Sequence, residues 1–161
     1  PTYAVRHLAD SLLWRAVADR LQHGATLALA SAMALAVSTH TLPVYEIFKV
    51  GEELSWTRGL DLFGMFGMDL AIVPHWNNNE GGAKLDTSRC YMGTERFAAL
   101  RAMLPASVVV LIEVVDGPVA VVPAPTTKLM LRFTSAAASG VPAAEEPLVS
   151  CNIASGLNQV V

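Results

Sequence analysis

Two short apolar runs, each followed by a reactive side chain, most strongly constrain how this chain can fold. Residues 26–30 lead directly to Ser31, and residues 69–73 lead through Pro74 to His75. Short, largely apolar runs are typical of strands that are buried on both faces, as in sheets covered by helices. Open α/β sheets place their ligand sites at the carboxyl ends of such strands, so Ser31 and His75 are expected to border a crevice.

Helical patterns surround these two strands. Apolar residues recur at three- and four-residue steps from Val5 to Leu21, which predicts one amphipathic helix that Gly24 can end. A second helix is expected to begin within residues 32–37, and a third covers residues 94–104. The alternation of helices and strands indicates the α/β class.

The carboxyl-terminal part of the chain contains further strand signals. Residues 108–112 form a β-branched run with the length of a buried strand, and residues 119–122 and 128–133 predict an antiparallel pair. Beyond these strands the composition turns to Ala, Ser, Gly and Pro, which predicts an extended or mobile segment. We therefore expect one α/β domain over residues 1–133 and a tail over residues 134–161.

The composition restricts the classes of partner. Of the 161 residues, 53% are hydrophobic and 16% are charged, so the chain must bury much of its surface or associate with further subunits, and we expect a homo-oligomer. A net charge of -3 without a basic stripe argues against nucleic-acid binding. Residues 24–45 lack charge, but Ser31, His40 and Pro43 interrupt them, so a buried strand and helix are favoured over a membrane span. We expect a cytoplasmic protein.

The cysteines suggest neither a disulfide framework nor a metal site. Cys90 and Cys151 are the two cysteines of the chain, and neither belongs to a Cys-x-x-Cys or Cys/His spacing typical of zinc. We therefore expect no zinc site, and the serine-hydrolase chemistry of the residues below implies no metal and no organic cofactor.

Three residues have the chemistry of a serine-hydrolase triad: Ser31, Glu46 and His75. A serine is a weak nucleophile until a base accepts its proton, and the base needs an acid to orient it. His40 is a second candidate for the base. Each triad candidate has a structural alternative: Ser31 as a small residue at a helix contact, His75 as a hydrogen-bonded histidine at a strand end, and Glu46 as an ion-pair partner of Lys49 or Arg58.

Four unusual segments lie within residues 42–93. They are PVYEIFKVG at 43–51, GLDLFG at 59–64, VPHWNNNEGG at 73–82 and LDTSRCYMG at 85–93. Together they resemble the cyanophycinase-like family of serine peptidases, which includes aspartyl dipeptidase and is related in fold to class I glutamine amidotransferases. This resemblance implies a three-layer, mostly parallel sheet with helices on both faces, whose amino-terminal part would precede Pro1.

The resemblance also implies roles for individual residues. The family's nucleophile lies in a Ser-Ala-Gly-Ala segment, replaced here by residues 31–34; an acidic residue follows fifteen positions later, and a histidine follows a proline at a strand end. Ser31 would attack an amide next to an aspartyl residue, His75 would transfer the proton, and Glu46 would hold the imidazolium. The backbone amide of Ala32 would belong to the oxyanion hole.

The chain departs from the family pattern around the nucleophile. An elbow of this kind usually has glycine two residues before and two residues after the serine, where this chain has Leu29 and Met33. The family's Gly-rich oxyanion turn would lie before Pro1, and residues 112–118 differ from its Gly-Ile-Asp-Glu-His-Thr-Ala-like segment. These departures support a second hypothesis: a degenerate family member or fragment that acts as a structural or binding subunit.

The loop predicted at residues 76–89 would border the crevice and contact a peptide or isopeptide substrate. Its candidate substrate-binding residues are Asn77, Asn78, Glu80 and Arg89. The asparagines could equally satisfy the backbone of their own loop. Arg89 could bind a substrate carboxylate through two nitrogens, or it could pair with Asp86 or Glu95.

Overall fold

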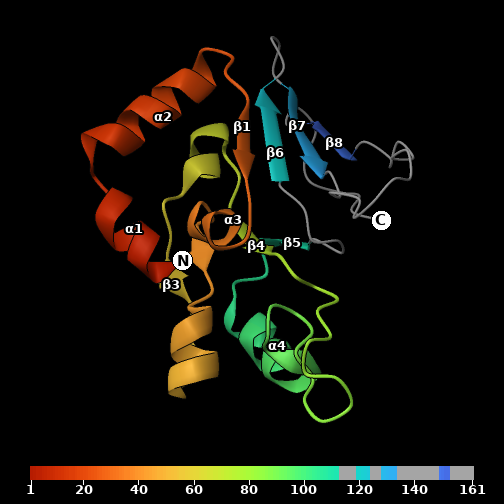
Figure 1. Cartoon of the computed structure of the whole chain (residues 1–161). Helices are drawn as coiled ribbons and strands as arrows, with labels where there is room; N and C mark the ends of the chain where they lie inside the picture. The colour runs from red at the N-terminus through yellow and green to blue at the C-terminus, as the bar shows by residue number, and fades with distance from the viewer. Residues whose placement is uncertain (113–118, 124–127, 134–148, 153–161) are drawn as a thin grey trace, which may run out of the picture.

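Short helices and strands alternate along the chain (Figure 1). The computed structural model describes residues 1–112, 119–123, 128–133 and 149–152. In chain order the elements are α1 (Thr2–Leu8), α2 (Leu12–Gln22), β1 (Leu27–Leu29), α3 (Ala32–Ala36), β2 (His40–Thr41), the π-helix η1 (Glu46–Val50), β3 (Thr57–Arg58), the 3-10 helix η2 (Leu62–Phe66), β4 (Leu70–Val73), α4 (Gly93–Met103), β5 (Val109–Ile112), β6 (Val119–Pro123), β7 (Lys128–Phe133) and β8 (Val149–Asn152). No helix in the described ranges combines the length and apolar character needed to cross a membrane.

The strands form one parallel pair and two antiparallel groups. β4 and β5 are parallel, with Leu70 opposite Val109 and Val73 opposite Ile112. β1, β6, β7 and β8 form an antiparallel sheet in that order, and β2 pairs with β3. Because the parallel pairing among the described strands is confined to β4 and β5, the three-layer, mostly parallel sheet stays a prediction.

The predicted strands at residues 26–30, 69–73 and 108–112 are present as β1, β4 and β5. The antiparallel pair predicted at 119–122 and 128–133 is also present, as β6 and β7. β8 lies within the segment predicted to be an extended or mobile tail, where it pairs with β7. Residues 113–118, which differ from the family's segment, lie outside the described residues.

Strand β4 lies between two hydrophobic clusters. All four of its side chains are buried. Leu70 and Ile72 belong to one cluster together with Phe63, whereas Val73 belongs to another together with Leu100 of α4. Successive side chains of a strand point to opposite faces, so both faces of β4 are covered. This is the packing expected of a short, continuously apolar strand.

The segment after α3 satisfies backbone groups of β4 that β5 does not reach. Ser38 Oγ accepts a hydrogen bond from the Ile72 amide at 2.9 Å. The Thr39 amide donates to the Leu70 carbonyl at 2.9 Å, and Thr39 Oγ1 accepts from the Leu70 amide at 3.3 Å. A buried backbone group without a partner costs about 1–3 kcal/mol, so these hydroxyls allow β4 to be buried completely.

The single amphipathic helix predicted from Val5 to Leu21 is wrong, because the structure has two helices there. α1 ends at Leu8, and Asp10 adopts a left-handed backbone with φ of 60°. Ser11 then begins α2 by accepting a hydrogen bond from the Trp14 amide at 3.1 Å. A serine at this position satisfies an amide that the new helix leaves unpaired, which favours a break over a continuous helix.

A substitution at Gly59 would test the close packing of the segment beside β4. A Cβ atom added there would lie 2.0 Å from the Ser38 carbonyl oxygen and 2.3 Å from Thr41 Oγ1. We expect Gly59→Ala to lower the free energy of unfolding by about 3 kcal/mol, because buried backbone would have to move. The matched control is Gly51→Ala, where φ is +84° but no atom lies within 4 Å; backbone strain alone should cost about 1 kcal/mol there. Urea denaturation measures both losses, and a smaller loss at Gly59 than at Gly51 would contradict this packing.

Candidate active site

Ser31 lies in the turn between β1 and α3. Its backbone is left-handed in φ, with φ of 47° and ψ of -116°, and its side chain is exposed. Such a conformation is strained for a residue with a Cβ atom and occurs most often at functional sites. A sharp, strained turn from a strand into a helix is the geometry that a nucleophile elbow uses to expose its hydroxyl.

The strained turn at Ser31 forms with Leu29 and Met33 at the positions where an elbow usually has glycine. Leu29 is only 6% exposed and belongs to the hydrophobic cluster that also contains Leu21 of α2. Met33 is half-buried and packs against the same cluster. Leu29 therefore lies in the core and Met33 packs against it, on the two elements that flank Ser31.

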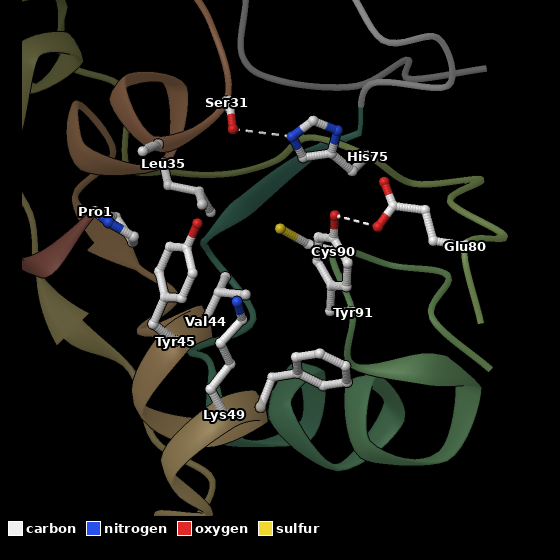
Figure 2. Close-up of a pocket in the computed structure, with 12 residues that line it drawn as sticks. Pro1, Ser31, Leu35, Val44, Tyr45, Lys49, His75, Glu80, Cys90 and Tyr91 are labelled. Carbon is white, nitrogen blue, oxygen red and sulfur yellow. Dashed lines mark hydrogen bonds between the residues drawn. The ribbon is translucent and has the colours of Figure 1, made fainter. Parts of the chain in front are cut away.

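His75 follows β4 and faces Ser31. Its φ is 55°, and its Nε2 lies 2.9 Å from Ser31 Oγ (Figure 2). In the tautomer with a proton on Nδ1, Nε2 accepts the hydrogen bond that the Ser31 hydroxyl donates. The structure thus brings together the two residues that follow the apolar strands, in the arrangement that a nucleophile and its base require.

Glu46, the predicted triad acid, has a different described partner. It lies in η1, and its Oε1 accepts a hydrogen bond from the Thr2 hydroxyl. Its Oε2 is buried and has no hydrogen-bond partner among the described residues. Within the same described ranges, no hydrogen bond or ion pair joins Glu46 to His75. The role of Glu46 as the triad acid stays a prediction.

The second candidate base, His40, lies beside Asp69 instead. Its Nε2 lies 3.1 Å from Asp69 Oδ1, next to the start of β4. His40 is also absent from the pocket that Ser31 and His75 line. The geometry therefore favours His75 as the partner of Ser31.

A pocket of about 310 Å³ opens in front of Ser31 and His75 (Figure 2). Lys49 belongs to η1, and Glu80 and Tyr91 come from the long segment between β4 and α4. The lining residues are Pro1, Ser31, Ala32, Leu35, Val44, Tyr45, Phe48, Lys49, His75, Glu80, Cys90 and Tyr91. The part of the chain that the structure describes contains no cluster of three or more metal-ligating side chains.

The predicted substrate-binding residues divide into two groups. Glu80 lines the pocket, and its Oε2 accepts a hydrogen bond from the Tyr91 hydroxyl at 3.0 Å. Asn78 instead supports its own loop by accepting from the Glu80 amide at 3.1 Å, and Asn77 is exposed outside the pocket lining. Of the candidates in this loop, the geometry supports Glu80 most directly.

Arg89 lies outside the pocket lining as well. Its guanidinium stacks over the Trp76 ring at 5.1 Å and donates to Ser88 Oγ at 2.6 Å. Neither predicted ion-pair partner, Asp86 or Glu95, forms a salt bridge with it among the described residues. Trp76 in turn packs edge-on against Phe97, as expected for a packing residue.

Sequence reasoning missed the pocket residues Tyr45, Lys49 and Tyr91. All three lie in the segments 43–51 and 85–93 that carry the family resemblance. Their position in these segments is the sequence feature that could have identified them as pocket residues. Tyr91 is partly desolvated in the structure. Burial, with a further contribution from its hydrogen bond to Glu80, raises the pKa of the Tyr91 hydroxyl above its usual value.

Asp86 anchors the loop that carries Tyr91. Its Oδ1 accepts from the Ser88 amide at 3.0 Å and from Ser88 Oγ at 2.6 Å. Its Oδ2 accepts from the Thr94 amide at 2.9 Å and from Thr94 Oγ1 at 3.0 Å, at the start of α4. These hydrogen bonds, first of all that from the Ser88 hydroxyl, hold the pKa of the Asp86 carboxyl well below its usual value of 3.8.

The depressed pKa of Asp86 predicts a pH-dependent contribution to stability. Ionised Asp86 should stabilise the fold fully above the pKa that it has in the unfolded chain, and this stabilisation should be lost as the pH falls through its lower folded pKa. We expect Asp86→Asn to lower the urea midpoint at about pH 7, and the difference from the unmodified chain to shrink below about pH 3. Glu53→Gln, at an exposed position, is the control. A difference that stays constant across this range would contradict the anchoring by the carboxylate.

Comparisons with known proteins identify no family for this chain. No family model, no curated protein and no solved structure matches it. The resemblance drawn from residues 42–93 therefore stays a prediction.

Proposed function

We propose that this protein is a serine hydrolase in which Ser31 is the nucleophile and His75 is the general base. The distance of 2.9 Å between Ser31 Oγ and His75 Nε2, at the strained turn after β1, is the observation that carries this proposal. The exposed hydroxyl and the adjoining pocket give a substrate access to the nucleophile.

The reaction follows from these two residues. His75 Nε2 accepts the Ser31 proton while Oγ bonds to the carbonyl carbon of the substrate. The resulting tetrahedral intermediate collapses to an acyl-enzyme when His75 gives the proton to the departing amine. A water molecule, deprotonated by the same imidazole, then releases the acid and restores the Ser31 hydroxyl.

We assign the amide of Ala32 to the oxyanion hole. Ala32 follows the nucleophile directly and lines the pocket. In elbows of this kind the amide after the serine is one of the oxyanion donors. Each such donor is worth about 3 kcal/mol of transition-state stabilisation.

The proposed substrate is a peptide or isopeptide amide next to an aspartyl residue. The resemblance of residues 42–93 suggests this bond, and a pocket of about 310 Å³ suits a small group. Lys49, which lies 5.2 Å above the Tyr45 ring, supplies a positive charge at the pocket that an aspartyl carboxylate requires. We therefore propose Lys49, rather than Arg89, as the residue that binds the substrate carboxylate.

A fluorophosphonate probe tests the nucleophile and the base. We expect stoichiometric labelling on Ser31, located by mass spectrometry, and loss of that labelling in Ser31→Ala and His75→Ala. Ser107→Ala and His23→Ala, both exposed and outside the pocket, should label as the unmodified chain does. A folded chain that does not label, or that labels at another residue, would overturn the proposed hydrolase.

Glu46 can be tested in the same assay. If Glu46 orients His75, Glu46→Gln should slow labelling by as much as about 10⁴-fold, the loss that follows when a triad acid is neutralised. The exposed Glu52→Gln is the matched control. A labelling rate equal to that of the control would remove Glu46 from the triad and leave it as the partner of Thr2.

The second candidate function is a structural or binding subunit without hydrolytic activity. The described hydrogen bond of the Glu46 carboxylate is to Thr2, and this observation favours the second candidate. In either function we propose a homo-oligomer, which analytical ultracentrifugation would detect as a mass above 17.1 kDa.

A further inference from the structure

The loop before α4 contains three successive residues in the left-handed backbone region. Their φ angles are 55° for Arg89, 57° for Cys90 and 68° for Tyr91. We call residues 89–91 the left-handed turn. One such residue is uncommon, and three in succession, none of them glycine, require surroundings that hold the backbone in this strained form.

The left-handed turn is bonded directly to the residues after β4. The Cys90 amide donates to the His75 carbonyl at 3.2 Å, and the Arg89 amide donates to the Trp76 carbonyl at 2.7 Å. The Tyr91 amide donates to the Thr87 carbonyl at 3.0 Å. The strained backbone therefore fixes the position of the chain that carries His75.

The same turn places an aromatic ring beside the imidazole. The centroids of the Tyr91 and His75 rings are 6.3 Å apart, with an interplanar angle of 61°. The ring centroids of Phe48 and Tyr91 lie 5.2 Å apart. Glu80 accepts a hydrogen bond from the Tyr91 hydroxyl at 3.0 Å (Figure 2). An edge-to-face pair at this separation is directional, so a fixed tyrosine ring restricts the orientation of its neighbour.

We infer that Tyr91 is a positioning residue for His75, held by the left-handed turn and by Glu80, and that its ring keeps Nε2 directed at Ser31. The catalytic consequence rests on the proposed function, whereas the effect on the imidazole does not. The hydroxyl donates to Glu80, so we assign the contact with the imidazole to the ring.

Labelling kinetics test the catalytic consequence. Tyr91→Leu removes the ring but keeps an apolar side chain, and we expect it to slow fluorophosphonate labelling of Ser31 about 10- to 100-fold, the order that misplacing a catalytic group by about 1 Å produces. Tyr91→Phe keeps the ring, so it should restore labelling to within about threefold of the unmodified rate. Equal rates for Tyr91→Leu and the unmodified chain would overturn the positioning role in catalysis.

The ring nitrogens of His75 provide a readout that needs no activity. We expect ¹⁵N NMR at fixed pH to show shifted and broadened His75 signals in Tyr91→Leu, and a much smaller change in Tyr91→Phe, which keeps the ring but loses the hydrogen bond to Glu80. The chain contains a matched control in Tyr3, whose ring lies 4.2 Å from that of His7: Tyr3→Leu should alter the His7 signals and leave His75 and the labelling rate unchanged.

A second variant, Glu80→Ala, tests the positioning of His75 independently of Tyr91→Leu. If Tyr91→Leu does not fold, Glu80→Ala removes the acceptor of the Tyr91 hydroxyl without touching the left-handed turn and should broaden the His75 signals to a smaller extent. Unchanged His75 spectra in every folded variant would overturn the inference. An unmodified chain that does not label, but whose His75 signals respond to Tyr91→Leu, would overturn the hydrolase and leave the positioning intact.

Discussion

The complete burial of β4 is the constraint on which the rest of this structure depends. Its side chains are covered on both faces, so its backbone has no access to water and every polar group along it needs a partner. β5 supplies partners on one side, and the hydroxyls of Ser38 and Thr39 supply them on the other. These bonds fix the strand that carries His75 relative to α3, whose first residue follows Ser31. Ser31 and His75 lie close together because the packing of the core fixes α3 and β4 relative to each other.

Strain is concentrated where the chemistry would take place. Ser31, His75 and the left-handed turn all have positive φ angles, and all lie at or beside the pocket. Elsewhere in the described residues, positive φ angles occur at Asp10 and Asp61 and at glycines such as Gly51 and Gly67. The strained side-chain-bearing residues are stabilised by their surroundings: the cluster around Leu29 for Ser31, and the carboxylate of Asp86 for the loop that carries Tyr91. A rigid shell of this kind is what preorganised catalysis requires.

The sequence contained enough information to predict part of the fold and the centre of the site. Short apolar runs predicted β1, β4 and β5, and their ends predicted Ser31 and His75, because burial and strand ends leave local patterns. The break at Asp10 was missed because apolar periodicity continues across it, and only the capping bond of Ser11 decides between one helix and two. The contact between Glu46 and Thr2 joins residues 44 positions apart, a kind of information that no local pattern carries. The left-handed turn was also invisible, since its residues are not those that favour this conformation.

The Ser38 and Thr39 hydroxyls, which bond to the backbone of β4, also limit how a peptide could bind there. Many peptide-binding proteins extend a sheet, so that the ligand pairs its backbone with an open strand edge. Ser38 and Thr39 already engage the Leu70 amide, the Leu70 carbonyl and the Ile72 amide on one side of the strand, and β5 pairs with it on the other. A peptide therefore finds few available backbone groups along β4, and at this strand it would be recognised mainly through its side chains and end groups. Selectivity would then depend on the groups next to the scissile bond rather than on a long stretch of sequence.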